Sequence, residues 1–320
     1  MAIRKIVVFH NMAGVGSAWC FNEGIVSVLR EMGYDVVDAR KPFRRNVPMW
    51  VLKKADLVIL SAPEWFTHRI RQRYGSRWAR LRTPKVAWYA ESSYRDDRTF
   101  PFAEMRHLAD LHYFPAIQDA EEFHGSWLPF GVDTSIYKPK AVPVVHEAAF
   151  IGSIYPKRAE YLKSVNFPLE MMKPVSSPDT RHSYELLADA YCSTKILVNL
   201  PAYSRLLVAR VTEALACGTF VLTPRLDHPS ALRNMDVYED RKHLVYYNQD
   251  RPDELAELVR YYLAHPEERA AIAKAGHDEV HAKHTLRQRL EKIIADAEAL
   301  PAPPPPRRWW HALTGAGRKT

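Results

Sequence analysis

Short apolar runs alternate with amphipathic stretches along most of this 320-residue chain. The first half contains IVVFH, YDVVDA, DLVILS, KVAWYA, LHYF and SWLPF, and the second half contains EAAFIGSI, FPLEMM, KILVNL, GTFVLT and HLVYY. Runs of this length, rich in β-branched and aromatic residues, are typical of buried strands, and the stretches between them are long enough for helices. The alternation predicts an α/β fold with parallel sheets wrapped by helices.

A proline-containing stretch, FGVDTSIYKPKAVPVVH, interrupts the alternation near residues 130 to 145. With ~150 residues per domain as a guide, we expect two facing Rossmann-like, doubly wound domains. We place the N-terminal domain at 1–140 and the C-terminal domain at 141–284. Residues 285–300 are expected to form a helix that returns to the N-terminal domain, and 301–320 a proline-rich spacer with a basic tail.

Composition excludes several classes of protein. Hydrophobic residues make up 47% of the chain and charged residues 26%, as in ordinary globular proteins. No apolar run reaches the ~18 residues of a membrane span, and the first residues lack the apolar core of a signal peptide. Three scattered cysteines without a CxxC pair fit reduced thiols. We therefore expect a cytoplasmic location.

The loop NMAGVGSAWC, residues 11–20, directly follows the first strand-like run and contains Gly14 and Gly16. A full dinucleotide-binding fingerprint needs a small residue at position 19, where Trp19 stands, and the lysine-bearing phosphate loop is absent. Because ligands of such sheets bind at the carboxyl ends of the strands, we expect this loop to line a cleft between the two domains. A simple tight turn is the alternative.

The most informative segment is KILVNLPAYSRLLVARVTEALACGTFVLTPR, which predicts a strand, a loop, a helix that stops at Gly218, and a second strand. Together with FIGSIYPKR, WLPFGVDTSIYKP and HLVYYNQDRPDELAELVRYYLAHPEERAAIAKAG, it resembles the nucleotide-sugar glycosyltransferases with two facing Rossmann-like domains (the GT-B fold). The resemblance is greatest to their CgeB-like, group 1 branch. It covers residues 125 to 295 well and the N-terminal half only in outline.

This resemblance implies transfer of a sugar from a nucleotide diphosphate to an acceptor hydroxyl. Glu213 would hold the ribose hydroxyls, and Lys157, Arg158 and Arg210 the diphosphate at a helix N-terminus. The alternative is a surface i, i+3 ion pair between Arg210 and Glu213. The other residues expected to bind the donor are Gly14, Gly16, Gly152, Ser153, Asn199, Ser204 and Arg205.

The sequence departs from the retaining branch at one position. That branch has a second Glu eight residues before the first, where this chain has Arg205, preceded by Ser204. The sequence therefore leaves open how the sugar is recognised and whether its anomeric configuration is retained or inverted. We prefer retention on the basis of the resemblance alone. We take Ser17 and Glu91 as candidate catalytic residues, Glu91 orienting the acceptor or acting as a base. The alternative for the Glu91 segment is a helix-capping cluster.

A metal site is not expected. No two aspartates stand two apart, so the DxD element of metal-dependent sugar transferases is missing. His277, His281 and His284 superficially suggest zinc, but Asp278 replaces the Glu of HExxH and a solvated helix is the better interpretation. We expect no cofactor beyond the nucleotide-sugar co-substrate, UDP- or GDP-linked.

Positive charge is concentrated in the N-terminal half. RIRQRYGSRWARLRTPK, residues 69–85, has seven basic residues and no acidic one. A solvated helix face is the usual meaning of such a run, but it also suits a polyanion. The residues expected to contact the acceptor are Arg69, Arg71, Arg73, Arg77, Arg80 and Asp133, the last alternatively bonding its own turn.

Three acceptors fit these features: hydroxymethylpyrimidine DNA of the phage type, an anionic envelope or lipid-linked precursor, and a small metabolite. Trp309 and Trp310, among basic residues of the tail, suggest a weak peripheral membrane contact. No stable protein partner is implied. The rival hypothesis is a non-catalytic nucleic-acid-binding protein on a glycosyltransferase scaffold, and a nucleotide epimerase is a weaker third.

Overall fold

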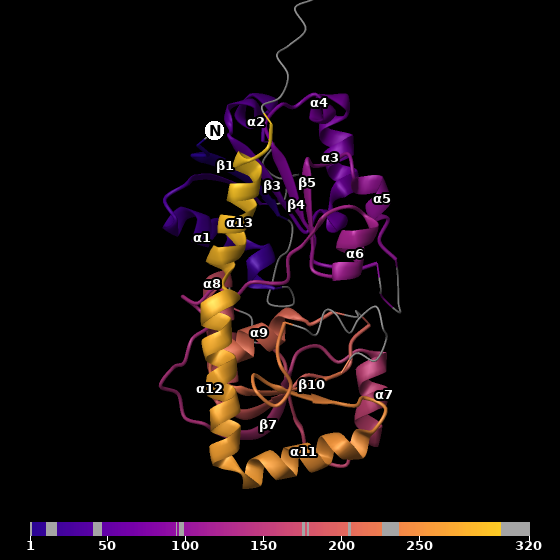
Figure 1. Ribbon diagram of the computed structural model, residues 1–320, viewed down its shortest axis with the longest axis vertical. Helices are drawn as coiled ribbons and strands as arrows, with labels where there is room; N and C mark the ends of the chain where they lie inside the picture. The colour runs from indigo at the N-terminus through magenta and orange to yellow at the C-terminus, as the bar shows by residue number, and fades with distance from the viewer. Residues whose placement is uncertain are drawn as a thin grey trace, which may run out of the picture.

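The computed structural model describes residues 2–10, 18–40, 47–93, 95, 99–174, 177, 179–203, 206–225 and 237–301. Two parallel sheets, each flanked by helices, form two domains placed one above the other in Figure 1. The expected α/β fold with two Rossmann-like domains is confirmed. Gly14, Gly16, Ser17, Ser204 and Arg205 lie outside the described residues.

The N-terminal sheet has the strand order β2-β1-β3-β4-β5-β6, with parallel pairing throughout. Its strands are β1 (Lys5–His10), β2 (Asp35–Arg40), β3 (Leu57–Ser61), β4 (Lys85–Trp88), β5 (Leu111–Phe114) and β6 (Ser126–Trp127). Its helices are α1 (Glu23–Glu31), α2 (Met49–Lys54), α3 (Thr67–Tyr74), α4 (Ser76–Ala79), α5 (Phe102–Met105) and α6 (Ile117–Glu122), with short 3-10 turns η1 (Trp19–Phe21) and η2 (Pro63–Trp65).

The C-terminal sheet has the order β11-β10-β9-β7-β8. Its strands are β7 (His146–Ile151), β8 (Glu170–Met172), β9 (Thr194–Val198), β10 (Phe220–Pro224) and β11 (Val245–Tyr247). Its helices are α7 (Pro156–Ser164), α8 (Thr180–Cys192), α9 (Ala209–Ala216), α11 (Pro252–Ala264) and α12 (Pro266–Lys283).

In both sheets the chain first adds a strand on one side and then continues on the other. The order therefore reverses between β1 and β3 in one sheet and between β7 and β9 in the other. The crevice at such a reversal, beyond the carboxyl ends of the strands, is where doubly wound sheets bind ligands. The topology thus selects the loops after β7 and β9 as the place to look for a donor.

The last helix, α13 (Leu286–Glu298), leaves the C-terminal domain and packs on the N-terminal one (Figure 1). Leu290, Ile293 and Ile294 are buried in the same core as residues of α1 and β1. Thr285 starts the helix with a capping box, its hydroxyl accepting from the Gln288 backbone. The burial of this apolar face explains why the chain crosses back over the first domain.

The contact between α13 and the sheet leads to a first prediction. The hydroxyl of Tyr113, a buried β5 residue, donates to Asp296 Oδ2 at 2.6 Å. Tyr113→Phe removes this hydrogen bond without changing the packing, so we expect the free energy of unfolding to fall by about 1–2 kcal/mol. Urea denaturation measures it, with Tyr261→Phe as the control because its hydroxyl bonds only the exposed Glu268. Equal losses in both variants would argue against a stabilising α13 contact.

Direct contacts join the two domains near η1. Trp19 Nε1 donates to Asp133 Oδ2 at 2.7 Å, and the Trp19 ring packs 4.9 Å from that of Tyr184 on α8. Asn22 Nδ2 donates to the Tyr184 hydroxyl at 2.8 Å. The large residue at position 19 is therefore a buried contact with the second domain, and this explains why a small residue is not found there.

Candidate active site

Gly152 and Asn199 follow β7 and β9 and lie at the point where the strand order of the C-terminal sheet reverses. Gly152 has a φ of +155°, and a Cβ there would clash with the guanidinium of Arg210. Asn199 is buried, and its Nδ2 donates to Thr223 Oγ1 at 2.9 Å. The two residues therefore leave room for Arg210 and orient it.

Arg210 lies in the first turn of α9, and its side chain crosses the crevice toward the end of β7. Its Nη1 donates to Asn199 Oδ1 at 2.9 Å, and its guanidinium stacks 4.7 Å from the ring centre of Phe150. The predicted alternative, a surface ion pair with Glu213, is not what the structure shows, since Glu213 is buried and bonded to Tyr191. Arg210 is instead held in place by neutral groups.

Arg158, on the first turn of α7, also contacts Phe150, with 4.8 Å between its guanidinium and the ring centre. Only 5% of this residue is exposed, and its nitrogens donate to two backbone oxygens, those of Ser153 at 2.8 Å and Pro201 at 3.2 Å. Burial, together with the nearby charge of Arg210, lowers its pKa to about 10. Among the described residues, neither arginine forms a salt bridge with a carboxylate.

Lys157 and two tyrosines border the same crevice. Lys157 Nζ donates to the Ala202 carbonyl at 3.1 Å and lies 5.8 Å from the ring centre of Tyr203. Tyr155 stacks on Tyr203 with 4.7 Å between the ring centres. This aromatic pair was not among the predicted site residues, although both tyrosines follow strands that end at the reversal. Ser153 is exposed beside them.

Glu213 lies one turn after Arg210 on α9 and is only 8% exposed. The hydroxyl of Tyr191 donates to its Oε2 at 3.2 Å. Burial raises the pKa of this carboxyl to about 7, although Tyr191 and Arg210 favour its ionised form. Burial, together with the negative charge of Glu213, raises the pKa of the Cys20 thiol in η1 of the N-terminal domain.

On the N-terminal domain, Glu91 lies in the loop after β4 and is ion-paired with Arg95. The alternative interpretation of this segment as a helix-capping cluster does not hold for the described residues, because Ser93 donates to Asp119 and the next described helix begins at Phe102. A second carboxylate beside this segment, not among the predicted site residues, is Glu64, which follows β3. Its Oε1 accepts from the Ala90 backbone at 2.7 Å, and burial, with the charge of Glu91, raises its pKa to about 8.

Asp133 is buried, and both of its carboxylate oxygens already have partners. Oδ2 accepts from Trp19, and Oδ1 accepts from the backbone and hydroxyl of Ser135 at 2.9 and 2.7 Å. We therefore assign Asp133 to the domain junction, where it also bonds its own turn. It is not available to an acceptor in this conformation.

The basic run is placed on α3 and α4, with Ile70, Tyr74 and Trp78 buried beneath it, as the helical spacing predicts. Arg71 Nη2 donates to the Glu104 carbonyl at 2.7 Å. Arg69 is half-buried, and the predicted acceptor residues exposed to solvent are Arg71, Arg73, Arg77 and Arg80. Figure 1 shows α4 at the end of this domain that faces away from the C-terminal domain. The basic run therefore leads away from the cleft rather than into it.

His277 and His281 lie on α12 and His284 directly follows it, and the three side chains do not come together. The rings of His277 and His281 lie 4.1 Å apart, but His284 bonds Arg289 instead. Within the described ranges no three metal-ligating side chains come together. Nor does any described helix have the length and apolar character needed to cross a membrane.

Comparisons with known proteins bear on this arrangement. Residues 158–295 match the family described as glycosyl transferase-like. Similar structures include HepE from Anabaena, solved with UDP-glucose (10% identity, 93% of this chain and 100% of that one, TM-score 0.62). Sucrose-phosphate synthase from Thermosynechococcus elongatus is 14% identical over 92% of this chain and 99% of that one, with a TM-score of 0.64.

An α-glucosyltransferase solved with UDP and a 13-mer DNA is also similar in structure, with 9% sequence identity and a TM-score of 0.64. The match covers 93% of this chain and 100% of the α-glucosyltransferase chain. No curated protein matches the chain in sequence. The structures establish the fold, which is the GT-B arrangement of two Rossmann-like domains. The match to the glycosyl transferase-like family covers residues 158–295, less than half of the chain.

Proposed function

We propose that the chain is a nucleotide-sugar-dependent glycosyltransferase and that its donor is a UDP-sugar whose diphosphate binds to Arg158 and Arg210. The observation that carries this is the pair of guanidiniums that both lie against the Phe150 ring, with neutral hydrogen-bond partners in the described structure. A buried cation is costly without an anion, and two close together repel each other. A diphosphate would remove both costs.

Further groups fit the same ligand. Helix α9 begins at Ala209 without a side-chain cap, so the positive end of its dipole would attract a phosphate bound beside Arg210. Glu213 would accept hydrogen bonds from the ribose hydroxyls. Gly152, Ser153, Asn199 and Lys157 complete the donor site, joined by Ser204, Arg205 and the 14–17 loop, which lie outside the described residues.

The preference for UDP is supported by the complexes of HepE with UDP-glucose and of the DNA glucosyltransferase with UDP. In the reaction the bond between the sugar carbon and the β-phosphate oxygen breaks, and a bond to the acceptor oxygen forms as the acceptor hydroxyl loses its proton. Charge develops on the departing UDP, where Arg158 and Arg210 would stabilise it. We propose that these cations make a metal ion unnecessary and that configuration is retained.

The acceptor would enter from the N-terminal domain. Glu64 and Glu91 follow the neighbouring strands β3 and β4. Glu64 accepts a hydrogen bond from the backbone amide of Ala90 and so helps to hold the loop that carries Glu91. We propose that Glu91 positions the acceptor hydroxyl and that the acceptor is polyanionic. The complex of a related fold with DNA supports DNA as one candidate, and an anionic envelope precursor is the other. Closure of the domains would exclude water.

A nucleotide panel tests the proposal. Thermal unfolding is followed with UDP, GDP, dTDP and ADP, each with and without EDTA. At a hundredfold excess over its dissociation constant, UDP should stabilise the fold by about 2.7 kcal/mol, with the same shift in EDTA. A shift with another nucleotide alone would replace UDP. No shift with any would favour the non-catalytic binding protein.

A further inference from the structure

A groove of about 790 Å³ lies on the N-terminal domain, away from the donor crevice. Among its lining residues, Ile3 precedes β1, Asp56 precedes β3 and Pro84 precedes β4, so the groove lies at the amino ends of these strands. The cleft between the domains lies at their carboxyl ends. A ligand in this groove would therefore leave the catalytic cleft open.

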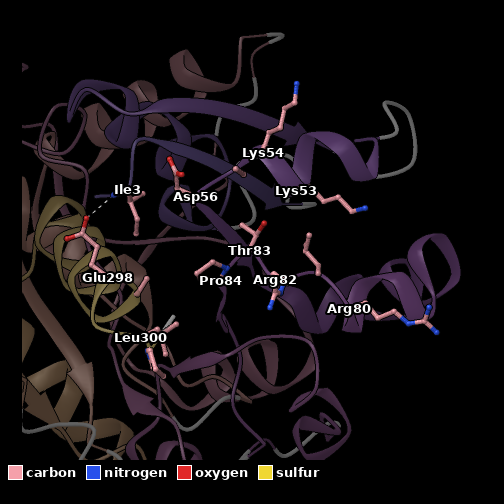
Figure 2. A pocket seen from close by; sticks show the side chains of 14 residues that line it. Ile3, Lys53, Lys54, Asp56, Arg80, Arg82, Thr83, Pro84, Glu298 and Leu300 are labelled. Carbon is pink, nitrogen blue, oxygen red and sulfur yellow. Dashed lines mark hydrogen bonds between the residues drawn. The ribbon is translucent and has the colours of Figure 1, made fainter. Parts of the chain in front are cut away.

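The groove combines an apolar wall with a basic rim. Ile3, Leu81 and Leu300 contribute apolar surface from three segments that are distant in sequence. The rim carries four exposed cations, Lys53, Lys54, Arg80 and Arg82. Figure 2 shows Lys53 and Arg80 on the side of the pocket opposite α13. We call these residues together the basic groove.

The acidic side chains of the groove are engaged with the backbone. Asp56 Oδ2 accepts from the amides of Arg4 and Lys5 at 3.0 and 2.8 Å. Glu298 Oε1 accepts from the amide of Ile3 at 2.9 Å, and Figure 2 shows it turned toward that residue. In the part of the chain that the structure describes, Lys53, Arg80 and Arg82 have no ion-pair partner. Four cations against two engaged carboxylates favour an anionic ligand.

Two neighbouring features narrow the chemistry of that ligand. Trp50 on α2 is 61% exposed, and Lys54 Nζ lies 5.4 Å from its ring centre. A large exposed aromatic ring beside lysines is typical of surfaces that contact the interface of a lipid bilayer. Pro301 also lines the groove, and the chain continues from it into PAPPPPRRWWHALTGAGRKT, whose basic and tryptophan residues are of the same kind.

We propose that the basic groove is a docking surface for an anionic lipid bilayer, with a lipid phosphate at the rim and apolar groups against the wall. Nucleic acid would account for the cations but not for the apolar wall or the exposed Trp50. The site is independent of the donor crevice, so it stands or falls separately from the proposed UDP-sugar activity.

Vesicle co-sedimentation of the full chain tests the proposal. The probes are vesicles of phosphatidylcholine alone, vesicles containing phosphatidylglycerol, and a 20-base-pair DNA duplex. The test variant is K53E/R80E/R82E, and the matched control K138E/R251E/R287E makes the same change in net charge at exposed positions outside the groove. Circular dichroism checks that both variants fold.

Wild type and control should bind the phosphatidylglycerol vesicles and not those of phosphatidylcholine alone. The groove variant should bind at least about 100-fold more weakly, because each basic residue at an anionic surface contributes about 1 kcal/mol. The difference should shrink at high salt. Equal binding by wild type and groove variant, absence of binding to any vesicle, or groove-dependent binding of DNA alone would each overturn the proposal.

Discussion

Arg210→Met is expected to weaken UDP binding about 100-fold, with a corresponding loss of sugar transfer. The Arg210 guanidinium is aimed across the crevice by Asn199 and Phe150, so its loss removes a preorganised, charge-assisted contact to the diphosphate. Truncating one member of a buried charged contact costs about 2–5 kcal/mol of binding free energy. Calorimetric titration of UDP measures the change.

The stability of the same variant distinguishes a binding role from a structural one. Because the described structure gives Arg210 no carboxylate partner, its replacement by an apolar chain should leave the unliganded protein at least as stable. Arg260→Met serves as the control, since that arginine lies on α11 and donates to the Asn166 carbonyl. Unchanged UDP affinity in a folded Arg210 variant would remove the diphosphate assignment.

Glu213→Gln is expected to stabilise the unliganded protein above neutral pH and to have little effect near pH 5. The pKa of the buried carboxyl is about 7, above the ordinary 4.5 of the unfolded chain. The folded state therefore favours the protonated form. Stability from this group is fully present below pH 4.5 and is lost as pH rises through 7. A neutral amide avoids the loss, which amounts to about 3 kcal/mol at pH 8.

Urea denaturation at pH 5 and pH 8 measures this difference. Glu239→Gln is the control, because Glu239 is exposed and its pKa is lowered by Lys242. A gain of equal size at both pH values would show that packing, not ionisation, is responsible. Glu213→Ala should in addition weaken donor binding without unfolding the protein. This is expected if the carboxylate binds the ribose hydroxyls although its burial lowers the stability of the protein.

The arrangement of strands could be read from the sequence because each strand is a compact apolar run. IVVFH, DLVILS and KILVNL are all strands of the structure, and the terminal helical stretch becomes α11, α12 and α13. The residues directly after these strands can also be identified from the sequence. Asn199 and Gly152, which were expected from the family resemblance, directly follow strands, and parallel strands bring their carboxyl ends to one edge. Glu64 also follows a strand, and the same logic would have found it.

Contacts between distant segments could not be predicted. The hydrogen bond from Asn22 to Tyr184 spans 162 residues and depends on how the two domains face each other. The basic groove needs Ile3, Leu81 and Leu300 to meet, which no local pattern indicates. Helical spacing predicted the buried face of α3 and α4, but the direction in which the basic face points was set by tertiary packing.

The most direct test of the central claim is multiple-turnover release of UDP from UDP-glucose, with hydroxymethylated DNA and anionic lipid extracts offered as acceptors. Wild type should release several equivalents of UDP per chain, with or without EDTA, and R158M/R210M should release almost none. Equal release by both proteins would show that the donor does not bind between these arginines. Absence of release from any nucleotide sugar would contradict the assignment of this chain as a glycosyltransferase acting through this site.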